Sequence, residues 1–171
     1  MASDARRKGR QTVLKSSSCI AQIRLIPGFR IKMDDIPTLR RILRENRVIA
    51  VVGLSAKQHR PSHSVAKYLL EHGYRVIPVN PAYQEVLGQK CYPSLRDIPE
   101  RVDIVDCFRR SAEIMPVAEA AIAVGAKVLW MQLGVINEAA AEKARKAGLE
   151  VVMDRCIEVE YARCWATGGE A

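Results

Sequence analysis

Residues 47–55, RVIAVVGLS, decide the fold that this sequence predicts. The segment Arg47–Val52 is apolar at every position after the arginine, and strands that are apolar on both faces are typical of the centre of a parallel sheet. Gly53 then allows a sharp turn and a close approach to the backbone. Pro61 and Ser62 suit the start of a helix, because proline fits the first helical turn and serine can cap free N–H groups. The stretch therefore predicts a strand–turn–helix unit.

Further strands and helices alternate along the rest of the chain. Apolar runs predict four more main strands, at Tyr74–Val79, Val102–Phe108, Lys127–Gln132 and Glu150–Met153. Helical patterns precede, separate and follow these strands: residues 34–46, a helix from Pro61 to Gly73, one from Ser111 or Pro116 to Gly125, one over Glu138–Ala147 capped by Asn137, and one over Arg155–Trp165. Residues 81–98 look irregular, and Leu87-Gly88 and Cys91–Leu95 are expected to add a short edge strand and a turn. This order predicts an α/β fold: a Rossmann-like, doubly wound parallel sheet of about five strands in three α/β/α layers.

Length and composition indicate one globular domain. The 171 residues are 49% hydrophobic and 27% charged, and no apolar run reaches the length of a membrane-spanning helix. The five cysteines have no Cys-x-x-Cys spacing, which argues against a zinc site or a disulfide framework and favours a reducing cytoplasm. His59 and His63 are four residues apart, but no third metal ligand accompanies them, so no metal site is predicted.

The positive charge is concentrated at the N-terminus. Residues 1–33 hold eight basic residues and one acidic residue, a net charge of +7, whereas residues 34–171 hold 19 basic and 18 acidic residues, a net charge of +1. We therefore expect a basic, disordered extension over 1–33 and a folded domain over 34–171. A misassigned start, an organelle-targeting segment and a nucleic-acid or partner-binding arm are alternatives for the extension. The nearly neutral domain disfavours nucleic acid as its main partner.

Polar residues follow several predicted strands, and the ends of parallel strands meet at one edge of the sheet. After the first strand come Gly53 and Ser55, and the helix behind them directs its free N–H groups and its positive dipole end toward this edge. Arg60 precedes that helix and Arg109 follows the third strand, so each can pair with a phosphate. Gln132, at the end of the fourth strand, is expected to face the cleft. The edge therefore predicts a phosphate-bearing ligand.

The usual dinucleotide fingerprint is missing from this turn. A Gly-x-Gly-x-x-Gly motif would need glycine at Ser55 and Gln58, and Asn80 stands where an acidic residue would hold the ribose of NAD. A Walker loop is absent too, because no Gly-Lys-Ser/Thr follows the first strand. Ordinary NAD binding is therefore disfavoured.

A family resemblance rests on a series of motifs in order: VVGLS (51–55), RPS (60–62), GYRVIPVNP (73–81), LG (87–88), VDIVDCFR (102–109), WMQLG (130–134) and VMDRC (152–156). Over residues 37–158 the chain resembles the small stand-alone CoA-binding proteins. Their fold is similar to the N-terminal CoA-binding domain of the succinyl-CoA ligase alpha subunit. The resemblance implies CoA on the first-strand turn, Asn80 and Pro81 near the adenosine, and Arg60 near a phosphate.

The expected ligand is coenzyme A or acyl-CoA. CoA carries a pyrophosphate and a 3′-phosphate, so it suits a helix N-terminus with more than one cation. Asn80 would not repel the 3′-phosphate as an aspartate would, although Asn-Pro is equally a good start for a turn. The candidate site comprises Gly53, Leu54, Ser55, Ala56, Arg60, Ser62, Asn80, Pro81, Arg109 and Gln132.

Several functions remain open at this level. The first is a non-catalytic CoA-binding module acting as a carrier, sensor or regulator. The second is an enzyme: a CoA-dependent transferase or ligase component that needs a partner chain, or a nicotinamide oxidoreductase. The ligase that the domain resembles uses a phosphorylated histidine on a second domain, which this sequence does not contain. Cys156, beside Arg155, is either a simple buried thiol or one able to form a mixed disulfide with CoA. The oligomeric state is also open, with a homodimer as one option.

Overall fold

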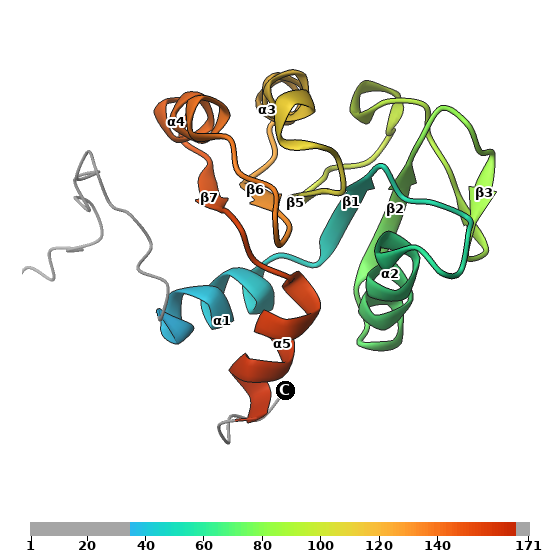
Figure 1. Ribbon diagram of the computed structural model, residues 1–171, viewed down its shortest axis with the longest axis horizontal. Coiled ribbons are helices and arrows are strands. Elements are labelled where there is room, and N and C mark those ends of the chain that lie inside the picture. The colour runs from blue at the N-terminus through green and yellow to red at the C-terminus, as the bar shows by residue number, and fades with distance from the viewer. Residues whose placement is uncertain (1–34, 167–171) are drawn as a thin grey trace, which may run out of the picture. The chain divides into compact units, whose positions relative to one another are not determined.

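A computed structural model describes residues 35–166, and its central element is a five-stranded sheet in which every strand pair is parallel (Figure 1). The strands are β1 (Val48–Val52), β2 (Arg75–Val79), β5 (Ile104–Cys107), β6 (Val128–Met131) and β7 (Glu150–Val152). Their spatial order is β2-β1-β5-β6-β7. The predicted Rossmann-like parallel sheet of about five strands is confirmed.

Helices cover both faces of this sheet (Figure 1). Helices α1 (Ile36–Glu45), α2 (Pro61–Glu71) and α5 (Ile157–Ala166) lie on one face, and α3 (Ile114–Ala123) and α4 (Glu138–Lys146) lie on the other. Strand β1 contributes side chains to the hydrophobic core on each face of the sheet. Ile49 and Val51 pack with α1, α2 and α5, whereas Ala50 and Val52 pack with α3 and α4. This explains why β1 is apolar at every position. Among residues 35–166, no helix is long and apolar enough to cross a membrane.

Local sequence determines where the helices begin. The side chain of Asp35 accepts a hydrogen bond from the N–H of Thr38 at the start of α1, and Asn137 caps α4 through the N–H of Ala140, as predicted. Helix α2 begins at Pro61, also as predicted. The helix expected from Ser111 or Pro116 starts as a 3₁₀ turn, η2 (Ser111–Glu113), and continues as α3.

The segment after β2 matches the expected edge strand and turn at Leu87-Gly88 and Cys91–Leu95 only in part. A separate antiparallel hairpin forms first, from β3 (Glu85–Val86) and β4 (Gln89–Lys90). Tyr92 makes a single bridge to Val79 of β2, and a 3₁₀ turn, η1 (Leu95–Asp97), follows. Pro93 stops the pairing beyond that bridge, because proline has no N–H to donate to a sheet.

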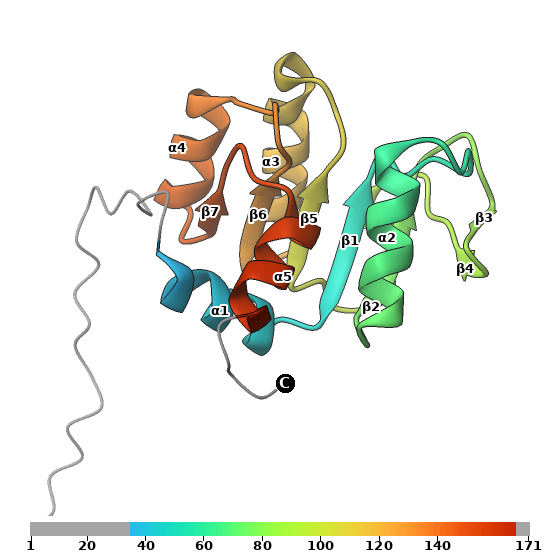
Figure 2. The same cartoon turned by 60° about the horizontal axis from the view of Figure 1, so that its bottom comes forward.

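The order of the strands reverses at β1. The chain runs from β1 to its neighbour β2 and then crosses back to β5 on the other side of β1, as Figure 2 shows. In open α/β sheets, such a switch point leaves a crevice outside the carboxyl ends of the two strands, and ligands bind there. In this molecule those ends are Gly53 after β1 and Phe108 after β5.

Candidate functional site

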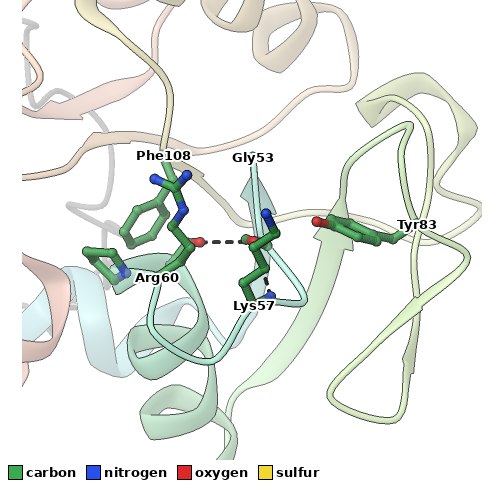
Figure 3. Close-up of a pocket in the computed structure, with 8 residues that line it drawn as sticks. Gly53, Lys57, Arg60, Tyr83 and Phe108 are labelled. Carbon is green, nitrogen blue, oxygen red and sulfur yellow. Dashed lines mark hydrogen bonds between the residues drawn. The ribbon is translucent and has the colours of Figure 1, made fainter.

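A hollow of about 320 Å³ lies at the switch point, beside the start of α2 (Figure 3). We call it the first hollow. It is lined by Gly53, Ser55, Lys57, Arg60, Pro61, Ser62, Tyr83 and Phe108. Four of the residues predicted from the sequence therefore meet here: Gly53, Ser55, Arg60 and Ser62.

Gly53 is required by both its conformation and its neighbours. Its φ is +88°, in the left-handed region that side chains disfavour. A Cβ at this position would lie 2.5 Å from the carbonyl oxygen of Phe108, which is closer than real Cβ contacts allow. Glycine at position 53 therefore allows the backbone at Phe108 to approach β1, and it also leaves space for a ligand.

Two serines shape the loop between β1 and α2. The buried Oγ of Ser62 accepts a hydrogen bond from the N–H of Ser55 at 3.2 Å, and Oγ of Ser55 accepts one from the N–H of Lys57 at 3.2 Å. These bonds fold the loop back on the start of the helix. Ser62 therefore holds the loop in place, and it does not cap the helix as the sequence suggested.

The start of α2 contributes positive charge to the first hollow. Arg60 occupies the N-cap position and makes no side-chain capping bond, in contrast to Asp35 of α1 and Asn137 of α4. Lys57 and Arg60 are both exposed, and Figure 3 shows Arg60 on one side of Lys57 and Tyr83 on the other. Among the described residues that line the hollow, none is acidic. The site is therefore suited to an anion.

Asn80 joins two loops with its side chain. Its Nδ2 donates to the carbonyl of Leu54 at 2.9 Å, and its Oδ1 accepts from the N–H of Ala82 at 3.0 Å. The first bond fixes the turn after β1, and the second starts the segment that carries Tyr83 to the hollow. Leu54 itself is fully buried beneath the turn, and Pro81 is exposed. Asn80 thus serves the site mainly by positioning its loops.

Gln132 differs from its expected orientation toward the open cleft. It is only 4% exposed, and its Nε2 donates to Oδ1 of Asp106 at 2.8 Å. Asp106 is completely buried in β5, and its other oxygen, Oδ2, has no partner. Desolvation raises the pKa of Asp106 to about 7, although hydrogen bonds from Gln132 and from the N–H of Cys107 oppose the shift.

Two other predicted residues lie near the first hollow without lining it. Ala56 is exposed in the β1–α2 loop, and Arg109 is half-buried with its side-chain stem against Gly53. Four lining residues were not among the predicted site residues: Lys57, Pro61, Tyr83 and Phe108. Phe108 and Lys57 lie in segments that the sequence already marked as strand ends and turns. Nothing in the local pattern around Tyr83 indicates that its loop returns to β1.

A family model for the CoA binding domain matches residues 47–162, well over half of the chain. The chain belongs to this CoA-binding domain family. The match runs from the start of β1 into α5 and includes every residue of the first hollow. It confirms the resemblance seen in the motifs.

Relatives of this CoA-binding domain protein include small proteins of similar length. The uncharacterized protein YneT of Bacillus subtilis is 44% identical over 124 residues, which are 72% of this chain and 92% of YneT. A solved hypothetical protein from Pyrococcus horikoshii is 45% identical with a TM-score of 0.75, and the match covers 85% of this chain and 99% of that chain. The matches therefore span nearly the full length of these small chains and 72% to 85% of this one.

The domain also resembles part of a much longer enzyme. ADP-forming acetate–CoA ligase II of Archaeoglobus fulgidus is 35% identical over 95 residues, which are 54% of this chain and 14% of the ligase. The rest of that ligase has no counterpart in the match.

Proposed function

We propose that the first hollow binds coenzyme A or acyl-CoA through its phosphates. One observation carries the proposal: Lys57, Arg60 and the start of α2 converge at the switch point of the sheet, and no acidic side chain lines the described part of the hollow. Two cations and a helix N-terminus suit a pyrophosphate together with a 3′-phosphate. Membership in the CoA-binding domain family supports the same ligand.

The adenosine part would lie toward Tyr83. This side chain is half-buried and lines the hollow from the β2–β3 connection, which begins at Asn80 and Pro81. An aromatic ring offers a flat surface on which a base can stack. Because both polar groups of the Asn80 side chain already bond to the protein, Tyr83 takes the main contact with the base in this proposal.

The lining supports binding without chemistry. Its described residues supply hydroxyls and cations, but no carboxylate, thiol or imidazole that would act as a base or nucleophile. Asp106 and Cys107 are fully buried in β5. A carrier, sensor or regulator of CoA levels fits this composition.

A second candidate is a component of an acyl-CoA ligase that works with a partner chain. It is favoured by the likeness to ADP-forming acetate–CoA ligases, in which this domain is a small part of the whole. Incubation with acetyl-CoA, ADP and phosphate tests it: ATP formation by the purified chain alone, or only after a lysate fraction is added, would identify a ligase or a ligase component.

Calorimetry against CoA, dephospho-CoA, NAD and ATP tests the proposed site. We expect CoA to bind best, and Lys57→Gln and Arg60→Gln each to weaken binding about tenfold, equivalent to about 1.4 kcal/mol. Arg96→Gln is the matched control, because it removes the same charge from an exposed position outside the hollow. Native mass spectrometry of the fresh protein would show retained CoA. Binding of NAD but not CoA would refute the proposal.

A further inference from the structure

A second hollow, of about 290 Å³, opens at the same edge of the sheet. It lies where β6 and β7 end and α5 begins. Its lining residues are Leu133, Asp154, Arg155, Cys156, Val159, Glu160 and Arg163.

Buried charges hold one wall of the second hollow in place. Nη1 of Arg155 donates to Oε1 of Glu160 at 2.6 Å, and these side chains are only 11% and 6% exposed. Arg163 donates to the same carboxylate at 3.0 Å, and the indole N–H of Trp130 donates to the carbonyl of Arg155 at 2.8 Å. The wall is therefore preorganised.

The mouth of the second hollow is apolar. Leu133 is 71% exposed and Val159 is 52% exposed, and they are two of the three large apolar side chains that stand out into solvent among residues 35–166. The half-buried Cys156 lies in the same lining, whereas the other cysteines of the described chain are buried. The four charged residues of the lining, Asp154, Arg155, Glu160 and Arg163, bond to groups of the protein itself. The apolar side chains therefore remain for contact with a small apolar group of a ligand.

The two hollows open on the same face of the sheet. Helix α2 borders the first and α5 the second, and both helices pack on the core that contains Val51 and Trp130. From β1 to β7 there are three strand spacings, which correspond to about 14 Å. The pantetheine arm of CoA has the backbone length of four to five amino-acid residues, so it reaches about 15 Å when extended.

We propose that the second hollow receives the thiol end of CoA, or a short acyl group on it, when the phosphates occupy the first hollow. This inference rests on the proposed function. Leu133 and Val159 would cover the cysteamine or acyl carbons, and the CoA sulfur would lie beside the thiol of Cys156. The molecule would then hold its ligand along the edge of the sheet, from β1 to β7.

Proximity of the two sulfurs can be measured by thiol–disulfide exchange. The probe is the mixed disulfide of CoA with 2-thiopyridine: the Cys156 thiolate attacks the CoA sulfur, a Cys156–CoA disulfide forms, and 2-thiopyridone leaves with the electron pair of the broken bond. The matched probe carries pantetheine in place of CoA and lacks the nucleotide. Release of 2-thiopyridone gives the rate, and peptide mapping locates the label.

We expect Cys156 to react with the CoA probe about tenfold faster or more than with the pantetheine probe, because anchoring raises the local concentration of the disulfide to the millimolar range. Excess adenosine 3′,5′-bisphosphate should abolish this advantage. In the control variant Cys156→Ser/Ala139→Cys, the new thiol is exposed at the start of α4, on the other face, and should react equally with both probes. Equal rates at Cys156, with CoA binding intact by calorimetry, would overturn the inference and leave the proposed function standing.

A second measurement does not depend on cysteine chemistry. Val159→Asp places a charge at the exposed mouth of the second hollow. It should weaken binding of acetyl-CoA about tenfold while leaving adenosine 3′,5′-bisphosphate unaffected, since only the arm reaches Val159. An unchanged ratio of the two affinities would contradict the inference. Failure of both ligands to bind the unmodified protein would instead refute the proposed function.

Discussion

Gly53 and the carbonyl oxygen of Phe108 form the contact on which the switch point depends. The ends of β1 and β5 approach so closely that a Cβ on Gly53 would lie 2.5 Å from that oxygen. Substitution by a large residue would therefore disturb the fold before it affected a ligand, and loss of CoA binding in such a variant would say little about phosphate contact. Lys57 and Arg60, whose side chains are exposed, are better probes of the site.

Gly53→Ala should lower the free energy of unfolding by about 3 kcal/mol or more, from the positive φ and the clash together. Gly125→Ala is the control: Gly125 has a φ of +70°, but nothing lies within 4 Å of its added Cβ, so it should lose only about 1 kcal/mol. Urea unfolding of both variants measures the difference. Equal decreases in the free energy of unfolding would show that the backbone at Phe108 moves away from the added Cβ without destabilising the protein.

Asp106 makes the stability of the protein depend on pH. Its pKa is raised to about 7 in the folded state, so its contribution is most favourable below pH 4 and is lost as the pH rises through 7. The loss amounts to up to about 4 kcal/mol. Asp106→Asn keeps an acceptor for Gln132 but cannot ionise, so we expect it to unfold at a higher temperature than the unmodified protein at pH 8. At pH 4 and below the two melting temperatures should nearly coincide. A constant difference between pH 4 and pH 8 would contradict this assignment.

At the level of elements, the sheet and its helices were predictable because each is determined by a local pattern. The apolar run 48–52 has to be buried on both faces, and Pro61 and Asn137 mark helix starts through their own backbone chemistry. A turn and a short edge strand were expected from Leu87-Gly88 and Cys91–Leu95, but the separate antiparallel hairpin β3–β4 was not. Its strands are two residues long, and its turn places Leu87 at a φ of +55°, a conformation that leucine does not favour.

The candidate site was predictable only in part, because it depends on where loops return. Gly53, Ser55, Arg60 and Ser62 belong to one strand–turn–helix unit, and the structure brings them together at the first hollow. Tyr83 reaches the same place only because Asn80 ties its loop to Leu54, which no periodicity shows. Gln132 ends a strand as expected, yet it bonds to buried Asp106, because polar groups inside a protein need partners there.

For the molecule as a whole, strand order places both hollows at one edge, while the net charge lies elsewhere in the chain. Residues 1–33 carry a net charge of +7, and residues 34–171 carry +1. Cations in the first hollow are therefore local features and do not reflect a generally basic domain. Electrostatic attraction of large polyanions would depend on residues 1–33. Binding of CoA would depend on Lys57 and Arg60.

Removal of residues 1–33 separates the effect of the basic N-terminal segment from the effect of the cations in the first hollow. The 34–171 protein keeps every described residue of the fold and all of the segment that the CoA binding domain model matches. We expect the 34–171 protein to keep its melting temperature within a few degrees and to bind CoA within twofold of the full chain. Any affinity of the full chain for single-stranded DNA should fall steeply with salt and disappear on truncation, because it would arise from charge alone. DNA binding that survives both truncation and raised salt would place a nucleic-acid surface on the folded domain, contrary to its near-neutral charge.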